Sequence, residues 1–287
     1  MYLAQIGKML PGAPDQIFGH IDGVKEWVDG LKNTDLGKFT NNNFAQIEIF
    51  HFIGMFLIGS YVILTGMRMM GLGIKEESIA VVDKNTRWFL HIGALLAIGT
   101  GLMMGVGNSG KLYSSEIFTS KMIAMVAGLT FSYFVMVPVA KRDGVATTGN
   151  RIGGAIGVAL LILALTIFAV RATANVGFFH MIWAAALILL VTLQGKMRNL
   201  YLIALLVLVI AWQVMTHVVI PVENEKYMLV NRVFMYLSGL LVFGLSLLNI
   251  FGTAAAPGSN NFSRLIAYAT IIAWVTVGAA GRWIGLS

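Results

Sequence analysis

No cysteine occurs among the 287 residues of this chain. This absence excludes iron–sulfur clusters, thioether-linked haem, thiolate metal sites and disulfides, because each of them needs cysteine sulfur. Charged residues are scarce as well, at 11% of the sequence, whereas 57% is hydrophobic and the mean hydropathy is +0.80. A soluble globular protein of this length does not have such a composition, so the sequence predicts an integral membrane protein.

Eight stretches are long and apolar enough to cross a bilayer as helices, since a span needs about 20 mainly apolar residues. They are residues 45–70, 88–107, 119–140, 151–171, 177–194, 199–220, 230–252 and 264–284. We expect an all-α polytopic bundle in three parts: an interfacial segment at 1–43, the first three spans at 44–142, and spans four to eight at 143–287. The longest interruption between spans, from Gly71 to Arg87, leaves no room for a soluble catalytic domain.

The excess of basic over acidic residues gives a net charge of +7. A basic chain suggests nucleic acid as a partner, but here the basic residues collect in short loops between spans, which is a topology signal and argues against nucleic-acid binding. One side carries most of them: Arg68, Lys75, Lys84, Arg87, Lys141, Arg142, Arg151, Lys196 and Arg198. Because basic loops stay in the cytoplasm, we expect a bacterial inner-membrane protein with both termini in the periplasm.

Residues 1–43 lack the uninterrupted apolar core of a signal peptide, so we expect them to persist in the mature protein. Apolar residues recur there at helical spacing: Ile17, Phe18, Ile21, Val24, Trp27, Val28 and Leu31. This pattern predicts an interfacial amphipathic helix from about Asp15 to Leu31 that lies on the outer membrane surface. His20 falls at the edge of the apolar arc, where a partly covered surface histidine is the simpler interpretation.

Four histidines lie inside apolar segments, where an ionisable side chain is costly and therefore indicates function. At about 1.5 Å of rise per residue, the predicted topology puts His51, His180 and His217 in one layer near the outer face. Imidazoles at one depth are typical of a ligand set for haem or another metal, and the alternative is that each only donates a hydrogen bond between helices. His91 would lie about 20 Å or more from this layer, as a separate site or as a neutral side chain bonded to a neighbouring helix.

A short motif recurs in two of the predicted spans. Phe50, His51, Phe52 and Ile53 are matched by Phe179, His180, Met181 and Ile182, and Gly66 and Gly195 each follow the histidine by fifteen residues. A four-plus-four parallel repeat would explain the match and would bring the two histidines to equal depth, whereas chance similarity between apolar helices is the alternative. We therefore expect one b-type haem with His51 and His180 as axial ligands, and with His217 as the substitute for His180.

Other polar residues stand where they would support such a cofactor. Glu48 precedes the first of these histidines by about one helical turn, and Gln213 precedes His217 in the same way, so both are candidate hydrogen-bond partners. Three basic residues at outward helix ends are suited to pair with haem propionates, or simply to reach the headgroups: Arg171, Lys121 and Arg282. Copper is a minority alternative, because the 16 methionines are scattered over both leaflets.

The first half of the chain resembles a known family. The resemblance covers about residues 44–140 and is carried by the stretch Ile47–Gly73 with Glu48 and His51, by residues 87–105, and by Ser120 and Lys121. It points to an uncharacterised bacterial family of membrane proteins that is distantly similar to the copper-resistance D-type membrane proteins and to b-type cytochrome membrane domains. The four-histidine pattern of two-haem quinol-oxidising cytochromes is missing.

These observations predict a membrane electron-transfer subunit that carries haem b near the outer face and exchanges electrons with a quinol or a periplasmic cytochrome. Since no extramembrane catalytic domain is expected, the chain would work with other membrane subunits rather than as a stand-alone enzyme. The alternatives are a non-redox anchor or assembly subunit of a larger complex, and a histidine-ligated site for copper or another metal.

Overall fold

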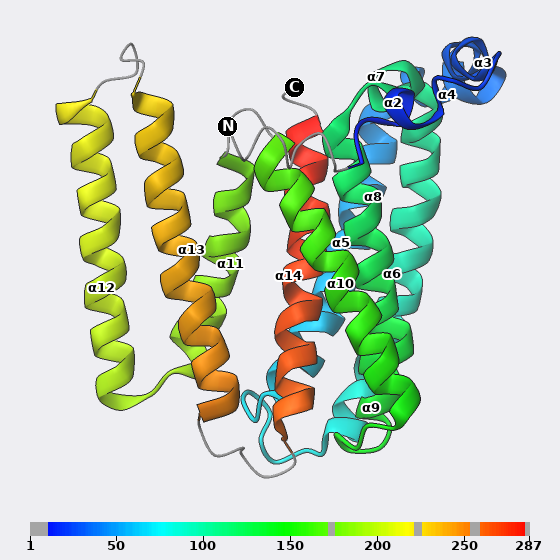
Figure 1. Ribbon diagram of the computed structural model, residues 1–287. Helices are drawn as coiled ribbons and strands as arrows, with labels where there is room; N and C mark the ends of the chain where they lie inside the picture. Colours follow the sequence, from blue (N-terminus) through cyan, green and yellow to red (C-terminus); the bar gives the residue numbers. More distant parts are fainter. Residues whose placement is uncertain (1–10, 172–175, 221–225, 253–258, 285–287) are drawn as a thin grey trace.

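The computed structural model describes residues 11–171, 176–220, 226–252 and 259–284, with the backbone alone at 170–171, 176–181 and 252. Every regular element in these ranges is helical (Figure 1). Seven helical stretches are long and apolar enough to cross a membrane: Phe44–Met69, Ile79–Gly107, Glu116–Ala140, Thr148–Ala169, Gly195–Val219, Tyr227–Phe251 and Asn261–Ile284. The prediction of an all-α membrane protein is confirmed at this level.

The seven stretches are built from the following elements: α5 (Phe44–Met69), α6 (Ile79–Gly107), α8 (Glu116–Leu129) with η1 (Thr130–Met136) and α9 (Val137–Ala140), α10 (Thr148–Arg171), α12 (Gly195–Val214) with η2 (Met215–Val219), α13 (Tyr227–Gly252) and α14 (Asn261–Ile284). The remaining expected span, 177–194, coincides with the apolar helix α11 (Val176–Thr192), which has 17 residues. A span needs about 20 residues, so the number of eight spans stays a prediction.

α14 lies at the centre of the bundle, between α5 and α11, and packs against both of them and against α8 (Figure 1). Most of its side chains are buried, and Trp274 Nε1 donates a hydrogen bond of 3.0 Å to Ser132 Oγ of η1. α12 and α13 lie at one edge of the bundle, where the apolar side chains of α12 are largely exposed. α14 therefore separates the helix that carries His51 from the helix that carries His180.

The two ends of the bundle differ in charge. α5, α9 and α11 end at the lower end in Figure 1, where α6, α10 and α12 begin. Most of the basic loop residues named above belong to these helix ends and to the loops that join them. The fold thus gathers them at one end, the end that the sequence predicts to be cytoplasmic.

The glycines that end the two copies of the short motif lie in different local structures. Gly66 lies inside the last turn of α5, whereas Gly195 follows the end of α11 and begins α12 with a φ of +58°. A left-handed conformation is one that glycine adopts readily, so Gly195 has a turn-forming role that Gly66 lacks. The four-plus-four repeat stays a prediction.

α6 begins at Ile79, so the expected boundary of the second span at residue 88 is wrong, and the loop before it is shorter than expected. The first N–H groups of a helix need acceptors outside the helix. Ser78 Oγ accepts a hydrogen bond of 3.2 Å from the N–H of Val81. Asp143 Oδ1, from the loop before α10, accepts one of 3.0 Å from the N–H of Ala80. Ser78 thus begins the helix before a charged stretch, residues 83–87, that hydropathy alone assigns to a loop.

Two charged residues in that stretch, Asp83 and Arg87, are paired with each other. Asp83 is fully buried, accepts a hydrogen bond of 2.8 Å from Tyr61 Oη of α5, and forms an ion pair with Arg87 one turn along α6. A buried carboxylate is tolerated when it is paired and hydrogen-bonded in this way. The network therefore explains how α6 continues through charged residues and how it is fastened to α5.

Replacing Tyr61 with phenylalanine should destabilise the protein, because the buried carboxylate of Asp83 then loses one donor. We expect the unfolding free energy in detergent to fall by about 1–3 kcal/mol. Tyr133→Phe is the control, since Tyr133 Oη bonds His91 Nδ1 at 3.2 Å at the exposed side of α6, where the loss should stay within about 0.5 kcal/mol. Equal losses in the two variants would contradict the role assigned to Tyr61.

The N-terminal region forms three short helices, so the single amphipathic helix expected from Asp15 to Leu31 is wrong. The helices are α2 (Pro14–Phe18), α3 (Val24–Leu31) and α4 (Asp35–Asn42). α2 ends at Phe18, and the turn that follows leads to Gly23, which precedes α3 in a left-handed conformation with a φ of +79°. α3 keeps its amphipathic character, with Val28 buried and Trp27 exposed.

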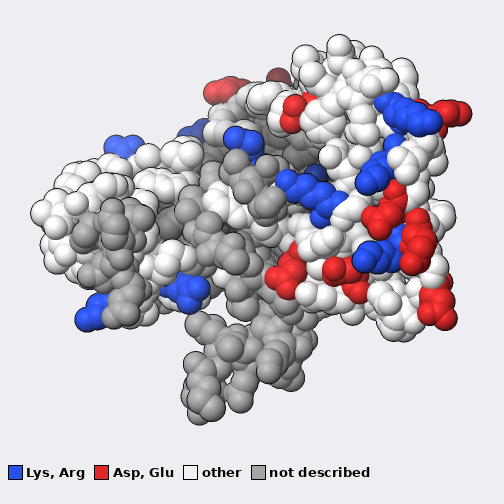
Figure 2. Space-filling view, turned by 90° about the horizontal axis from the view of Figure 1, so that it is seen from above, with Lys and Arg blue, Asp and Glu red and all other residues white. Residues whose placement is uncertain are grey.

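These helices lie over one end of the bundle and are fastened there through backbone oxygens. Ser109 Oγ donates a hydrogen bond of 2.7 Å to the Val28 carbonyl, and Thr119 Oγ1 donates one of 2.8 Å to the Gly12 carbonyl. Figure 2 shows that acidic and basic side chains are intermixed at this end; those of α2 to α4 and their connections are Asp15, Asp22, Lys25, Glu26, Asp29, Lys32, Asp35 and Lys38. The three helices form a polar cover over the membrane-spanning helices below.

α5 and α6 approach so closely that their backbones touch. A Cβ atom on Gly54 would lie 2.6 Å from the backbone nitrogen of Ala97, and one on Gly93 would lie 2.7 Å from the Gly54 carbonyl oxygen. Only glycine fits at a contact of this kind, which is typical of tightly packed transmembrane helices. The contact lies about one helical turn from His51 on α5 and sets the position of its imidazole relative to α6.

Candidate functional site

A cavity of about 320 Å³ lies between α5, α6, α8 and α14, under the N-terminal helices. Its walls are mainly apolar, and three methionines contribute to them: Met55, Met122 and Met125. Pro14, Val28 and Leu31 close its outer end, together with residues of α7 (Ser109–Tyr113). A concave, apolar site with a few polar groups is the usual form of a ligand or cofactor site.

His51 is the only histidine of the described ranges that lines this cavity. Its imidazole lies against the backbone of α6, since a Cβ atom on Gly101 would be 3.3 Å from His51 Cε1. Gly101 thus provides the room in which the ring sits. A larger residue at this position would push the imidazole out of place.

The hydrogen bonds of His51 decide which ring nitrogen carries the proton. Nδ1 lies 3.1 Å from Thr100 Oγ1, and that hydroxyl donates its own proton to the Leu96 carbonyl. The hydroxyl must therefore accept from the ring, which makes Nδ1 the protonated nitrogen and leaves a lone pair on Nε2. The Ala97 carbonyl of α6 is a further hydrogen-bond acceptor for the ring, in addition to Thr100, which bonds Nδ1. A neutral imidazole held in this tautomer is oriented to bind a metal through Nε2.

Two further polar residues line the cavity, and neither has a polar partner among the described residues. Lys121 of α8 forms no ion pair or hydrogen bond with any described residue, and its Nζ lies beside Gly281, 3.4 Å from where a Cβ would be. Tyr113 of α7 is 8% exposed, and its hydroxyl is buried without a partner. Sequence reasoning selected Lys121 but missed Tyr113 and Thr100, because no motif marks a lone hydroxyl in an apolar stretch.

The other residues predicted for this site lie elsewhere. His217 is exposed on η2, at the edge of the bundle, and its Nδ1 faces Thr216 Oγ1 at 3.0 Å and the Gln213 carbonyl at 3.2 Å. The partner of His217 in α12 is thus the main chain of Gln213 and not its exposed side chain. Glu48 is half-buried on α5 and does not line the cavity. The side chains of His180 and Arg171 lie outside the described residues.

His91 stands apart, in the half of α6 remote from the cavity. Its ring stacks on Tyr133 of η1 at a centroid distance of 5.6 Å and is hydrogen-bonded to it through Nδ1. This hydrogen bond joins His91 to a neighbouring helix, as one of the two expectations for it required. Within the described ranges, no three side chains among His, Asp and Glu come close enough together to hold a metal ion.

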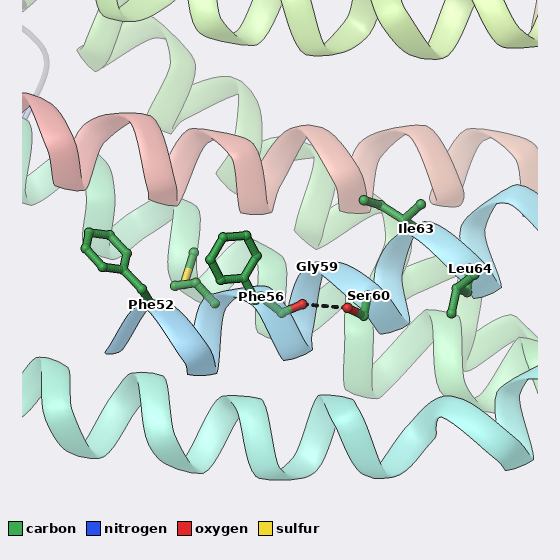
Figure 3. Close-up of a pocket in the computed structure, with 7 residues that line it drawn as sticks. Phe52, Phe56, Gly59, Ser60, Ile63 and Leu64 are labelled. Carbon is green, nitrogen blue, oxygen red and sulfur yellow. Dashed lines mark hydrogen bonds between the residues drawn. The ribbon is translucent and has the colours of Figure 1, made fainter. Parts of the chain in front are cut away.

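A second hollow, of about 510 Å³, follows the exposed side of α5 (Figure 3). All of its lining residues come from this one helix: Phe52, Met55, Phe56, Gly59, Ser60, Ile63 and Leu64. The Ser60 hydroxyl donates a hydrogen bond of 2.8 Å to the Phe56 carbonyl in the same helix, so no free polar group converges on the hollow. Despite its larger volume, it has the character of a lipid-facing groove and not of a functional site.

Comparison with known proteins identifies the family. Residues 25–179 match the model of DUF6644, a family of unknown function, and the chain belongs to this family. The match extends beyond the expected residues 44–140 at both ends and includes α3 to α10, with His51, Tyr113 and Lys121. No curated protein and no solved structure matches the chain. Nothing in these comparisons links it to copper-resistance D-type proteins or to b-type cytochromes.

Proposed function

We propose that this member of the DUF6644 family holds a haem b in the His51 cavity and works as an electron-transfer subunit of a bacterial inner membrane. The observation that carries the proposal is the placement of His51, which lines an apolar cavity while Thr100 holds its ring through Nδ1, so that Nε2 is the nitrogen we assign to a ligand. Axial histidines of haem proteins bind iron through one nitrogen and are oriented by a hydrogen bond from the other.

The residues of the cavity fit this cofactor. Apolar walls exclude water from a flat hydrophobic ring, and Gly101 gives the imidazole room beside α6. For the second axial position, Met122 and Met125 of α8 offer thioether sulfur in the same cavity. His180 stays a prediction as a ligand, and it would have to reach the cavity past α14. The exposed edge position of His217 does not favour it as the substitute.

Bound haem would supply reversible one-electron chemistry at its iron. The contribution of the chain is to orient the ligand nitrogen, to keep water away and to hold the group close to the end of the bundle that carries the N-terminal helices. We assign that end to the periplasm because the basic loops gather at the opposite end. A quinol in the outer leaflet or a periplasmic redox protein is then within reach as electron partner, and other membrane subunits complete the host complex.

The direct test is the reduced-minus-oxidised absorption spectrum of the full chain, purified in detergent from cells supplied with a haem precursor. We expect a b-type spectrum at up to one haem per chain. Metal analysis of the same sample separates the alternatives, since copper without haem would favour the copper site. A chain that carries neither metal and does not take up added haem would contradict the proposal and favour a non-redox anchor or assembly subunit.

A further inference from the structure

We infer that Lys121 and Tyr113 form the anchoring site for the carboxylate groups of the molecule that fills the His51 cavity. This inference rests on the proposed function, in which the occupant is haem b and the carboxylates are its two propionates. It adds a residue that the sequence did not single out, Tyr113, and it assigns a direction to the bound cofactor.

Lys121 needs an anion that the chain itself does not supply. Its ammonium group lines a mainly apolar cavity, and no described carboxylate forms an ion pair with it. A cation in such surroundings loses hydration, and a bound opposite charge offsets that loss. His51 lines the same cavity, and a histidine cannot neutralise a lysine.

Tyr113 independently indicates that a hydrogen-bond acceptor is missing from the cavity. Its hydroxyl is buried and lacks a hydrogen-bond partner, although buried hydroxyl groups in proteins are normally paired. The side chain lines the same cavity as Lys121 but comes from a different helix, α7. A phenol and an ammonium are both donors, so a ligand that satisfies the two must present acceptor oxygens, and a carboxylate does so with charge as well.

The arrangement along the cavity fits an amphiphile with its acidic end outward. Tyr113 lies in the cover at the outer end, and Lys121 lies in the second turn of α8, which begins at that end. The deeper wall consists of apolar side chains such as Ile98, Met125 and Trp274. A haem bound in this direction would turn its propionates toward the outer surface and its hydrophobic edge toward the bilayer interior.

The test compares two porphyrins, haem b and its dimethyl ester, in which both carboxylates are blocked. Each is titrated into the full chain, produced without haem and purified in detergent, and binding is followed by absorption and by quenching of tryptophan fluorescence. We expect the wild-type chain to bind haem b at least about tenfold more tightly than the ester, since the charge-assisted hydrogen bonds are lost in the ester.

Variants decide whether Lys121 and Tyr113 cause this preference. Lys121→Met and Tyr113→Phe should each reduce it, and the double variant should bind the two porphyrins alike, whereas Lys121→Arg should retain it. Lys111→Met is the control, because Lys111 is an exposed lysine at the same end of the bundle and is expected to have no effect. Melting temperatures of the unliganded variants exclude loss of folding as the cause.

The outcomes separate this inference from the proposed function. Equal binding of the two porphyrins by the wild-type chain, or a preference that survives in the double variant, would overturn the anchoring role and leave the haem site standing. Binding of neither porphyrin would overturn both. Loss of affinity for both porphyrins alike in the Lys121 and Tyr113 variants would assign these residues a structural role instead of carboxylate binding.

Discussion

Replacing His51 with alanine is expected to abolish the haem spectrum of the purified protein without changing its helix content or its insertion into the membrane. The imidazole is half-buried and touches α6 through Thr100 and Gly101, so its removal enlarges a cavity that already exists. Iron would then lack the one nitrogen ligand that the cavity presents. Absorption spectra report the haem, and circular dichroism reports the fold.

Further variants define the chemistry behind this result. Free imidazole added to His51→Ala should restore part of the spectrum, since it supplies the missing nitrogen within an otherwise intact cavity. Thr100→Val, which keeps the shape but removes the acceptor for Nδ1–H, should weaken haem binding by about 10–100-fold. His91→Ala and His217→Ala should keep full haem content. An unchanged spectrum in His51→Ala would refute the site, and loss of haem in His180→Ala would identify His180 as the second ligand.

A second large effect is expected from adding a methyl group at the contact between α5 and α6. In Gly54→Ala the new Cβ would lie 2.6 Å from the Ala97 nitrogen and 2.9 Å from the Gly93 carbonyl oxygen, and neither backbone atom is able to rotate away. The helices must separate, at a cost of about 1–3 kcal/mol or more. Because the same contact sets His51 against α6, we expect a lower melting temperature together with a loss of haem affinity.

Gly59→Ala is the matched control for this substitution. Gly59 lies on the same helix, and a Cβ added there would meet no atom within 4 Å. Stability and haem content should therefore stay close to those of the wild-type chain, within about 0.5 kcal/mol. If Gly54→Ala behaves like Gly59→Ala, the close contact between α5 and α6 does not control the site.

The sequence predicted where the helices lie along the chain better than it predicted which helices contact one another. Long apolar runs locate α5, α10 and α13 because hydropathy is a local property of the chain. The start of α6 was misplaced because the hydrogen bond from Tyr61 to the buried Asp83 comes from a second helix and is invisible in the local pattern. The break at Gly23 in the N-terminal region was missed because the apolar periodicity continues across it.

The candidate site was predicted in the same uneven way. An ionisable side chain inside an apolar run drew attention to His51, and a lysine near a helix end drew attention to Lys121. The partners of His51 depend on which helices are neighbours, and α14, the last helix of the chain, lies between α5 and α11. No periodicity in the sequence gives that order, so the pairing of His51 with His180 rested on the repeat alone.

Two of the hydrogen bonds that hold the cover over the cavity end on main-chain oxygens, those of Gly12 and Val28. Every amino acid carries the same carbonyl oxygen, so most side chains of this segment can change without disturbing its attachment. The donors, Ser109 and Thr119, do not have that freedom. In other members of the family we expect the cover to vary in sequence while keeping its length, and the two hydroxyl positions beneath it to vary little.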